Sequence, residues 1–196
     1  MLSKNIFRKL PIIETSLFTL RKLTVNDSAD IFAYASKPEM TKYTLWQTHI
    51  SHDDTKAFLA VMEGKYEAGE PASWGIVLKE TDRVIGTCGF EAYSEVDDCA
   101  AIGYVIAPEY WGKGLMSKVV AEVIHFGFEV IGLNRIEATC DVDNIGSAKV
   151  MEKNGMKFEG ILREYRKIRG VYRDTKYYSI LKREYMKTNI TKKETI

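Results

Sequence analysis

The sequence is poor in the residues that mark several protein classes. Its 196 residues include three cysteines, three histidines and four prolines. The cysteines, Cys88, Cys99 and Cys140, are too few and too widely spaced for a disulfide framework or a CxxC metal site, and so few histidines make a zinc site improbable. No apolar run approaches the roughly 18–20 residues of a membrane span, and the first residues lack a signal-peptide pattern. We therefore expect a reduced, cytoplasmic, metal-free protein that does not enter a membrane.

The chain also lacks an excess of either charge. Lysine and arginine number 28 against 27 aspartates and glutamates, which leaves a formal net charge of +1. Such a balance gives no field that would attract nucleic acid, so strong direct nucleic-acid binding is not expected. Repeats, low-complexity tracts and Pro/Gly-rich linkers are missing as well. This predicts one domain over 1–196, with its core over about 12–185 and loose termini at 1–10 and 186–196.

What the chain does have is a mixture of strand-like and helix-like periodicity, typical of an α/β (α+β) fold. Strands are predicted over 17–23, 73–78, 84–92, 100–106, 135–140, 156–167 and 171–181, and helices over 24–36, 53–66, 115–131 and from Asp143 or Asn144 to 154–155. Short joins between 73 and 106 favour an antiparallel meander. Helices between later strands favour some parallel pairing, so the sheet should be central and mixed.

The most informative segment is the glycine-rich loop between the strand over 100–106 and the long helix. The first amides of a helix have no partner within the helix, and its dipole is positive there, so an anion such as phosphate can bind. Gly112 and Gly114 permit close backbone approach, Lys113 adds a cation and Ser117 a hydroxyl. The loop matches neither the Walker A pattern nor the GxGxxG dinucleotide fingerprint. A glycine-rich helix start without a ligand is the alternative.

The segment resembles the phosphate loop of the GCN5-related N-acetyltransferases (GNAT superfamily), an Arg/Gln-x-x-Gly-x-Gly/Ala pattern. It departs from that pattern at Trp111 and Met116. Its Tyr-Trp-Gly-x-Gly form is similar to the RimJ/RimL branch, which acetylates ribosomal-protein N-termini. The resemblance spans about residues 17–185 and includes Ile102-Gly103-Tyr104, Asp143-Asn144-x-x-Ser147, Glu152-Lys153-Asn154-Gly155-Met156, Glu159-Gly160-x-Leu162-Arg163 and Gly170-x-Tyr172-x-Asp174-x-x-x-Tyr178-x-x-Leu181. It implies a mostly antiparallel mixed sheet of six to seven strands, about four helices on both faces, and a splayed strand pair.

The resemblance also implies a set of residues that bind acetyl-CoA as cosubstrate. One strand would pair through its backbone with the pantetheine arm, the loop and helix start would hold the pyrophosphate, and Asn144 would contact the cofactor. For Asn144 a plain helix N-cap is the alternative, and the two roles are compatible. The predicted cofactor-binding residues are Tyr104, Val105, Ile106, Trp111, Gly112, Lys113, Gly114, Leu115, Met116, Ser117, Asn144 and Ser147.

The catalytic residues are predicted by position within the same branch. Ser147 is a candidate proton donor to the CoA thiolate, with a helix-surface residue as the alternative; the tyrosine that many family members use is replaced by Met151. The branch often carries a glutamate where this chain has Ala101, so the general base is open. Glu91 and Glu164 are the candidates, and exposed strand carboxylates without a role are the alternative for both.

These residues predict direct transfer of an acetyl group from acetyl-CoA to a primary amine. The branch favours a protein N-terminal α-amine, such as that of a ribosomal protein, over a small amine such as a polyamine, amino acid or antibiotic. A non-catalytic acyl-CoA-binding module and a dinucleotide oxidoreductase remain as rival classes. A monomer or a homodimer is expected. The basic last hairpin fits contact with ribosomal RNA or the 3′-phosphate of CoA, or simply a solvated strand pair.

Overall fold

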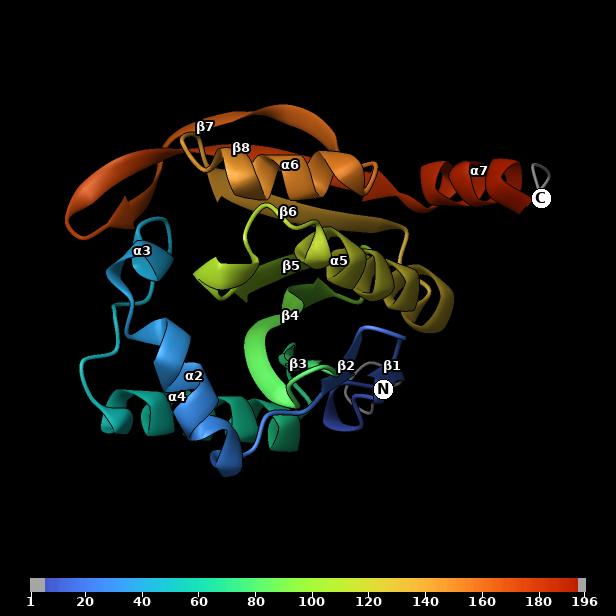
Figure 1. The fold of residues 1–196 in the computed structure, drawn as a ribbon. Helices are drawn as coiled ribbons and strands as arrows, with labels where there is room; N and C mark the ends of the chain where they lie inside the picture. The colour runs from blue at the N-terminus through green and yellow to red at the C-terminus, as the bar shows by residue number, and fades with distance from the viewer. Residues whose placement is uncertain (1–5, 194–196) are drawn as a thin grey trace.

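The computed structural model describes residues 6–193, which form an eight-stranded sheet flanked by helices (Figure 1). The strand order is β1-β2-β3-β4-β5-β6-β8-β7, and every neighbouring pair is antiparallel except β5 and β6. The strands are β1 (Ile13–Glu14), β2 (Phe18–Arg21), β3 (Ser73–Leu78), β4 (Arg83–Ser94), β5 (Cys99–Ile106), β6 (Arg135–Asp141), β7 (Lys157–Ile168) and β8 (Val171–Leu181).

Helices cover both faces of the sheet. The 3₁₀ turns η1 (Val25–Asp27) and η2 (Pro108–Tyr110) and the π-helical turn η3 (Gly127–Ile131) accompany six α-helices in the described part of the chain. These helices are α2 (Ser28–Ala35), α3 (Pro38–Thr41), α4 (His52–Ala68), α5 (Leu115–Phe126), α6 (Ile145–Lys153) and α7 (Lys182–Lys193). Helices α5 and α6 pack side by side, α5 on β4 and β5 and α6 on β6 and β7, whereas α2 packs on β4 from the other face.

The core is densest between α5 and the central strands. Trp74 of β3 is fully buried and lies edge-on to Phe126 of α5, with ring centroids 5.3 Å apart. Phe90 of β4 completes the cluster, 6.1 Å from Trp74. Val119 and Val123 of α5 are also fully buried. The long apolar helix predicted over 115–131 is therefore confirmed, although its last turn is π-helical.

Three details of the predicted fold need correction. The sheet has eight strands rather than six to seven, because β1 has only two residues and leaves no periodic signal. Two helices, α3 and α7, were not expected: α3 is a single turn that begins at Pro38, and α7 carries no apolar stripe in its sequence. In Figure 1, α7 projects from the end of β8.

The predicted loose termini are also partly wrong. Phe7 and Leu10 are buried, and Phe7 packs edge-on against Phe90 at 5.7 Å, so the segment from residue 6 belongs to the core. At the other end, α7 continues the chain as a helix as far as Lys193. Residues 1–5 and 194–196 lie outside the described range. Within that range, no helix combines the length and the apolar character that crossing a bilayer requires.

Candidate active site

The glycine-rich loop has the backbone that its sequence demands. Gly112 and Gly114 adopt φ of +72° and +76°, in the left-handed region that disfavours side chains. A Cβ at either position would meet open space, so the requirement is conformational rather than steric. Trp111 fixes the start of the loop, because its indole Nε1 donates to the Ile106 carbonyl at 2.7 Å. The loop therefore turns directly from the end of β5 into α5.

The start of α5 has the features of an anion site. No side chain among the described residues caps its first amides, and its first turn carries no acidic residue. Lys113 lies over the ring of Tyr110, 5.6 Å from the centroid, beside the same turn. Free amides and a positive dipole end can together bind a phosphate group. The residues present thus fit the pyrophosphate of CoA.

The remaining predicted loop residues, Leu115, Met116 and Ser117, make contacts that support the start of α5. Met116 is buried in the core and Leu115 packs against it, so their side chains support the helix while their amides remain in its first turn. The Ser117 carbonyl accepts from Asn154 Nδ2 of α6 at 3.1 Å, which ties the two helices together.

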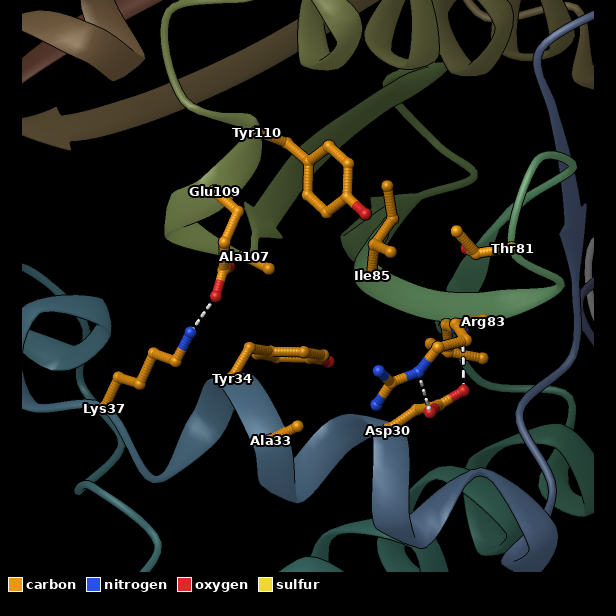
Figure 2. A pocket seen from close by; sticks show the side chains of 11 residues that line it. Asp30, Ala33, Tyr34, Lys37, Thr81, Arg83, Ile85, Ala107, Glu109 and Tyr110 are labelled. Atoms are coloured by element: carbon orange, nitrogen blue, oxygen red, sulfur yellow. Dashed lines mark hydrogen bonds and ion pairs between the residues drawn. The ribbon is translucent and has the colours of Figure 1, made fainter.

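Figure 2 shows how the residues before this loop are fixed on the α2 side of the sheet. A hollow of about 230 Å³ lies between α2 and η2, with Tyr34 among its lining residues. At one end Lys37 forms an ion pair with Glu109 of η2, and at the other Arg83 pairs with Asp30 at 2.7 Å. The Lys37–Glu109 pair ties η2, and hence the loop that follows it, to the segment after α2, whereas the Arg83–Asp30 pair ties β4 to α2.

Strands β5 and β6 separate soon after they begin. Their parallel pairing covers only Cys99–Ala101 against Arg135–Glu137, and beyond Ala101 the strand β5 pairs with β4 alone. The splayed strand pair implied by the resemblance is therefore present. Main-chain groups of β5 that point toward β6 are available to an extended ligand, as at any sheet edge. Tyr104, Val105 and Ile106, predicted to contact the pantetheine, lie in this stretch.

On the α6 side of the gap, Tyr104 and Ser147 are joined. The Tyr104 hydroxyl donates to the Ser147 carbonyl at 3.0 Å and shares a 2.9 Å hydrogen bond with Ser147 Oγ. Burial raises the pKa of Tyr104 above its usual value, so the phenol is protonated at neutral pH. The Asn144 side chain accepts from the Ser147 amide at 3.1 Å, which confirms the N-cap interpretation. The sequence predicts Ser147 as a site residue but not the role of the Tyr104 hydroxyl, for which Ile102-Gly103-Tyr104 is the available signal.

Glu91 lies on the opposite face of the gap. It occupies a bulge of β4, between the pairs Phe90–Ile102 and Ala92–Ala101. A Cβ built on Gly103 would come within 1.9 Å of Glu91 Oε1, so the carboxylate lies directly over Gly103 of β5. Only glycine at 103 leaves this room. The second candidate base, Glu164, is exposed on the edge strand β7, and β8 separates that strand from β6.

Several charged side chains of the last hairpin serve the fold. Arg173 binds the fully buried carboxylate of Asp141 through two nitrogens, at 2.8 and 2.9 Å, and also Asp143. Arg169, at the turn between β7 and β8, donates to the Thr41 carbonyl, and Figure 1 shows this turn beside α3. The turn of the hairpin is thus held against α3. Among the described residues, no group of three or more His, Cys, Asp or Glu side chains could hold a metal ion.

Comparison with known proteins agrees with this geometry. The family model described as "Acetyltransferase (GNAT) domain" matches residues 18–157, more than half of the chain. The chain belongs to the GNAT acetyltransferases. It is therefore similar to N-acetyltransferases rather than to dinucleotide oxidoreductases, and enzymes of this family use acetyl-CoA.

The relatives of this GNAT protein include uncharacterised N-acetyltransferases and, more distantly, ribosomal-protein acetyltransferases. The uncharacterized N-acetyltransferase YoaA of Bacillus subtilis (strain 168) is 37% identical over 88% of this chain and 97% of its own length. The ribosomal-protein-serine acetyltransferase of Escherichia coli (strain K12) is 30% identical over 53% of this chain and 58% of its own. A solved structure of RimL, a ribosomal L7/L12 α-N-protein acetyltransferase in complex with coenzyme A, matches with a TM-score of 0.79 over 87% of this chain and 98% of its own, at 20% identity. That likeness shows the fold.

Proposed function

We propose that this GNAT enzyme transfers the acetyl group of acetyl-CoA directly to a primary amine. The observation that carries the proposal is the Tyr104–Ser147 pair on one side of the β5–β6 gap, opposite the Glu91 carboxylate over Gly103. A proton donor and a proton acceptor on opposite sides of one gap match the needs of acyl transfer. Cys88 and Cys140 are buried, which disfavours an acyl-enzyme route.

Acetyl-CoA would bind with its pyrophosphate at the first turn of α5 and its pantetheine arm along the outer edge of β5. Amides alternate in direction along a strand, and the Ala107 amide donates to Ile85 of β4, so the amides of Tyr104 and Ile106 point to that edge. One of them would hydrogen-bond the thioester carbonyl. A fixed donor at such an oxygen contributes roughly 3–4 kcal/mol to transition-state stabilisation.

The two proton transfers would then take place on opposite faces of the gap. The Ser147 hydroxyl, supported by the Tyr104 phenol, would protonate the departing thiolate. Glu91 would take a proton from the attacking amine, directly or through water. An α-amine, with a pKa near 7.7–8.0, is partly neutral already at pH 7 and requires only a weak base. Glu164 is the less favoured base because it lies on the edge strand.

The acceptor that we favour is the N-terminal α-amine of a protein, of the ribosomal type. Its support is the relationship with the ribosomal-protein-serine acetyltransferase, which covers about half of this chain. A small amine is the second candidate, because a cavity beside the gap is large enough for one. We further propose a cytoplasmic enzyme built as a single domain, working as a monomer or homodimer.

The test is thiol release from acetyl-CoA by the full chain, with peptides that begin with Ser or Ala and with small mono- and diamines. We expect thiol release with at least one of these amines. We expect no reduction of NAD when the protein is given NAD and an alcohol. Calorimetric binding of CoA without thiol release to any amine would instead identify a non-catalytic binding module. Turnover unchanged in Ser147→Ala and Glu91→Gln would refute the residue roles.

A further inference from the structure

A cavity of about 470 Å³ opens where β5 and β6 begin. Its lining includes Ala101 of β5 and Glu137 of β6, which are directly paired across the two strands. Side chains alternate along a strand, so Ala101 points away from the face that carries Tyr104 and α6. The cavity therefore lies on the same side of the sheet as Glu91, the face from which we expect the amine to approach. It is the size of a pocket for a small molecule or a few residues of a peptide.

The walls of this cavity have more negative than positive charge. Glu137 and Asp97 line it, and Arg135 is its one lining cation among the described residues. The Arg135 guanidinium is shared: it binds Glu137 at 2.5 Å and holds Glu159 through two nitrogens at 2.9 and 2.5 Å. The Tyr177 hydroxyl donates to the other oxygen of Glu137. The Glu137 carboxylate is thus held in one orientation, and two carboxylates, those of Glu137 and Glu159, share a single guanidinium.

Glu137 also stands at the point where the two strands separate. Ala101–Glu137 is the last pair of the β5–β6 ladder. Gly103, which lies under the Glu91 carboxylate, is two residues further along β5 on the same face. Two strand residues span about 7 Å and neighbouring strands lie about 5 Å apart, so the backbone of Glu137 is roughly 8 Å from the glycine under the proposed base. Ala101 occupies the position where the branch often has a glutamate. Glu137, which is paired with Ala101 from the neighbouring strand, supplies a carboxylate beside that position.

We propose that Glu137 binds a second positive charge of the acceptor, while the reacting nitrogen lies nearer Glu91. This inference rests on the proposed function and specifies its substrate class as an amine that carries another cationic group within roughly 8 Å of the reacting nitrogen. A diamine has that chemistry, and so does a peptide whose second residue is basic. Glu137 is a positioning residue in this role, because the proton transfer belongs to Glu91.

The first experiment probes the charge of the cavity by chemical labelling and does not depend on enzymatic turnover. Cys99 lines the cavity and is half-buried, whereas Cys88 and Cys140 are buried. We would compare its labelling rates with the cationic 2-aminoethyl and the anionic 2-sulfonatoethyl methanethiosulfonates, with Cys99→Ser as the blank. We expect the cationic reagent to react about tenfold faster after correction for intrinsic reactivity, as a nearby carboxylate would cause. Glu137→Gln should lower that ratio at least about threefold.

The matched control is Glu159→Gln, which also removes one carboxylate from Arg135 but not one that lines the cavity. It should leave the ratio nearly unchanged. Glu137→Asp, which keeps the charge, should retain most of the selectivity, and thermal melts would confirm that each variant is folded. An equal fall in Glu137→Gln and Glu159→Gln would overturn the proposal, because the effect would then belong to the Arg135 network as a whole.

The second experiment measures the acceptor itself. Butane-1,4-diamine should exceed butylamine in kcat/KM by about tenfold in the wild type, and Glu137→Gln should remove most of that preference through the KM of the diamine. The peptides Ser-Lys-Ala-Gly and Ser-Met-Ala-Gly form the corresponding pair for a protein acceptor. A preference that persists in Glu137→Gln would refute the subsite alone. Charge-selective labelling without thiol release to any amine would refute the proposed function instead.

Discussion

The Tyr104–Ser147 pair gives the sharpest prediction, because its two members can be removed separately. Tyr104→Phe deletes the hydroxyl that bonds Ser147 Oγ at 2.9 Å and the Ser147 carbonyl at 3.0 Å. Two hydrogen bonds of this kind are worth about 1–3 kcal/mol of unfolding free energy. Ser147→Ala removes the hydroxyl that is proposed to protonate the thiolate. If the pair delivers the proton, each substitution should lower kcat by about a hundredfold, the lower end of the range for a general acid.

A double-mutant cycle separates a joint role from two independent ones. Groups that act as one unit lose their effect together, so Tyr104→Phe/Ser147→Ala should be no slower than the slower single variant. Steady-state thiol release with a reactive amine supplies kcat, and urea denaturation supplies stability. Because the pKa of Tyr104 lies above its usual value, the phenol should add no limb to the kcat profile between about pH 6 and 9.

Tyr178→Phe is the matched control. Tyr178 of β8 is also buried, and its hydroxyl donates at 3.1 Å to Glu152 of α6, the helix that carries Ser147. It should cost similar stability and leave kcat within about threefold of wild type. Multiplied losses in the double variant, or a Tyr104→Phe enzyme as active as Tyr178→Phe, would refute the joint proton delivery.

The remaining predictions concern the loop and the ion pairs. Gly114→Ala places a side chain at φ +76° at a cost of about 1–2 kcal/mol and should weaken CoA binding about tenfold by calorimetry, whereas an unchanged affinity would contradict the loop's role. Asp141→Asn leaves Arg173 without its buried partner and should lower the unfolding free energy by about 2–4 kcal/mol in urea; a loss below about 1 kcal/mol would contradict this. Arg135 and Ser179 lower the pKa of Glu159 from 4.5 to about 2, so its stabilisation is present above pH 4.5 and disappears as the pH falls toward 2. Glu159→Gln should flatten that part of the stability curve, and an unchanged slope would count against the assignment. Arg169→Met should speed amide exchange at the β7–β8 turn, because the donation to Thr41 is lost; equal rates would show that the contact does not hold the turn.

The parts of the fold that could be predicted are those with a strong local pattern. Helix α5 has apolar residues at helical spacing over its whole length, and Gly132 ends the turn that follows it at φ +85°. The glycine-rich loop could be predicted because its positive φ angles require glycine at 112 and 114, and glycines are visible in the sequence. Strand β1 and helix α7 escaped prediction for the opposite reason: a two-residue strand and a polar helix have no periodic apolar signal.

The candidate site was predictable in its positions but not in its contacts. Ser147 and Asn144 could be placed at the start of one helix, since a cap and a residue one turn on are local features. The bond from Tyr104 joins residues 43 positions apart, and no local pattern encodes it. The place of Glu91 over Gly103 depends on a bulge in β4, which shifts the register by one residue. Strict alternation along the strand does not reveal that shift.

The early end of the β5–β6 ladder has a consequence for how the protein avoids aggregation. Unpaired strand edges normally invite other molecules to add strands, and proteins shield them at the margins of their sheets. Here the unpaired edge lies in the middle of the sheet, between strands of the same molecule, where a foreign strand has little access. The protein can therefore keep backbone donors and acceptors open for a ligand without the aggregation hazard that an outer edge would carry.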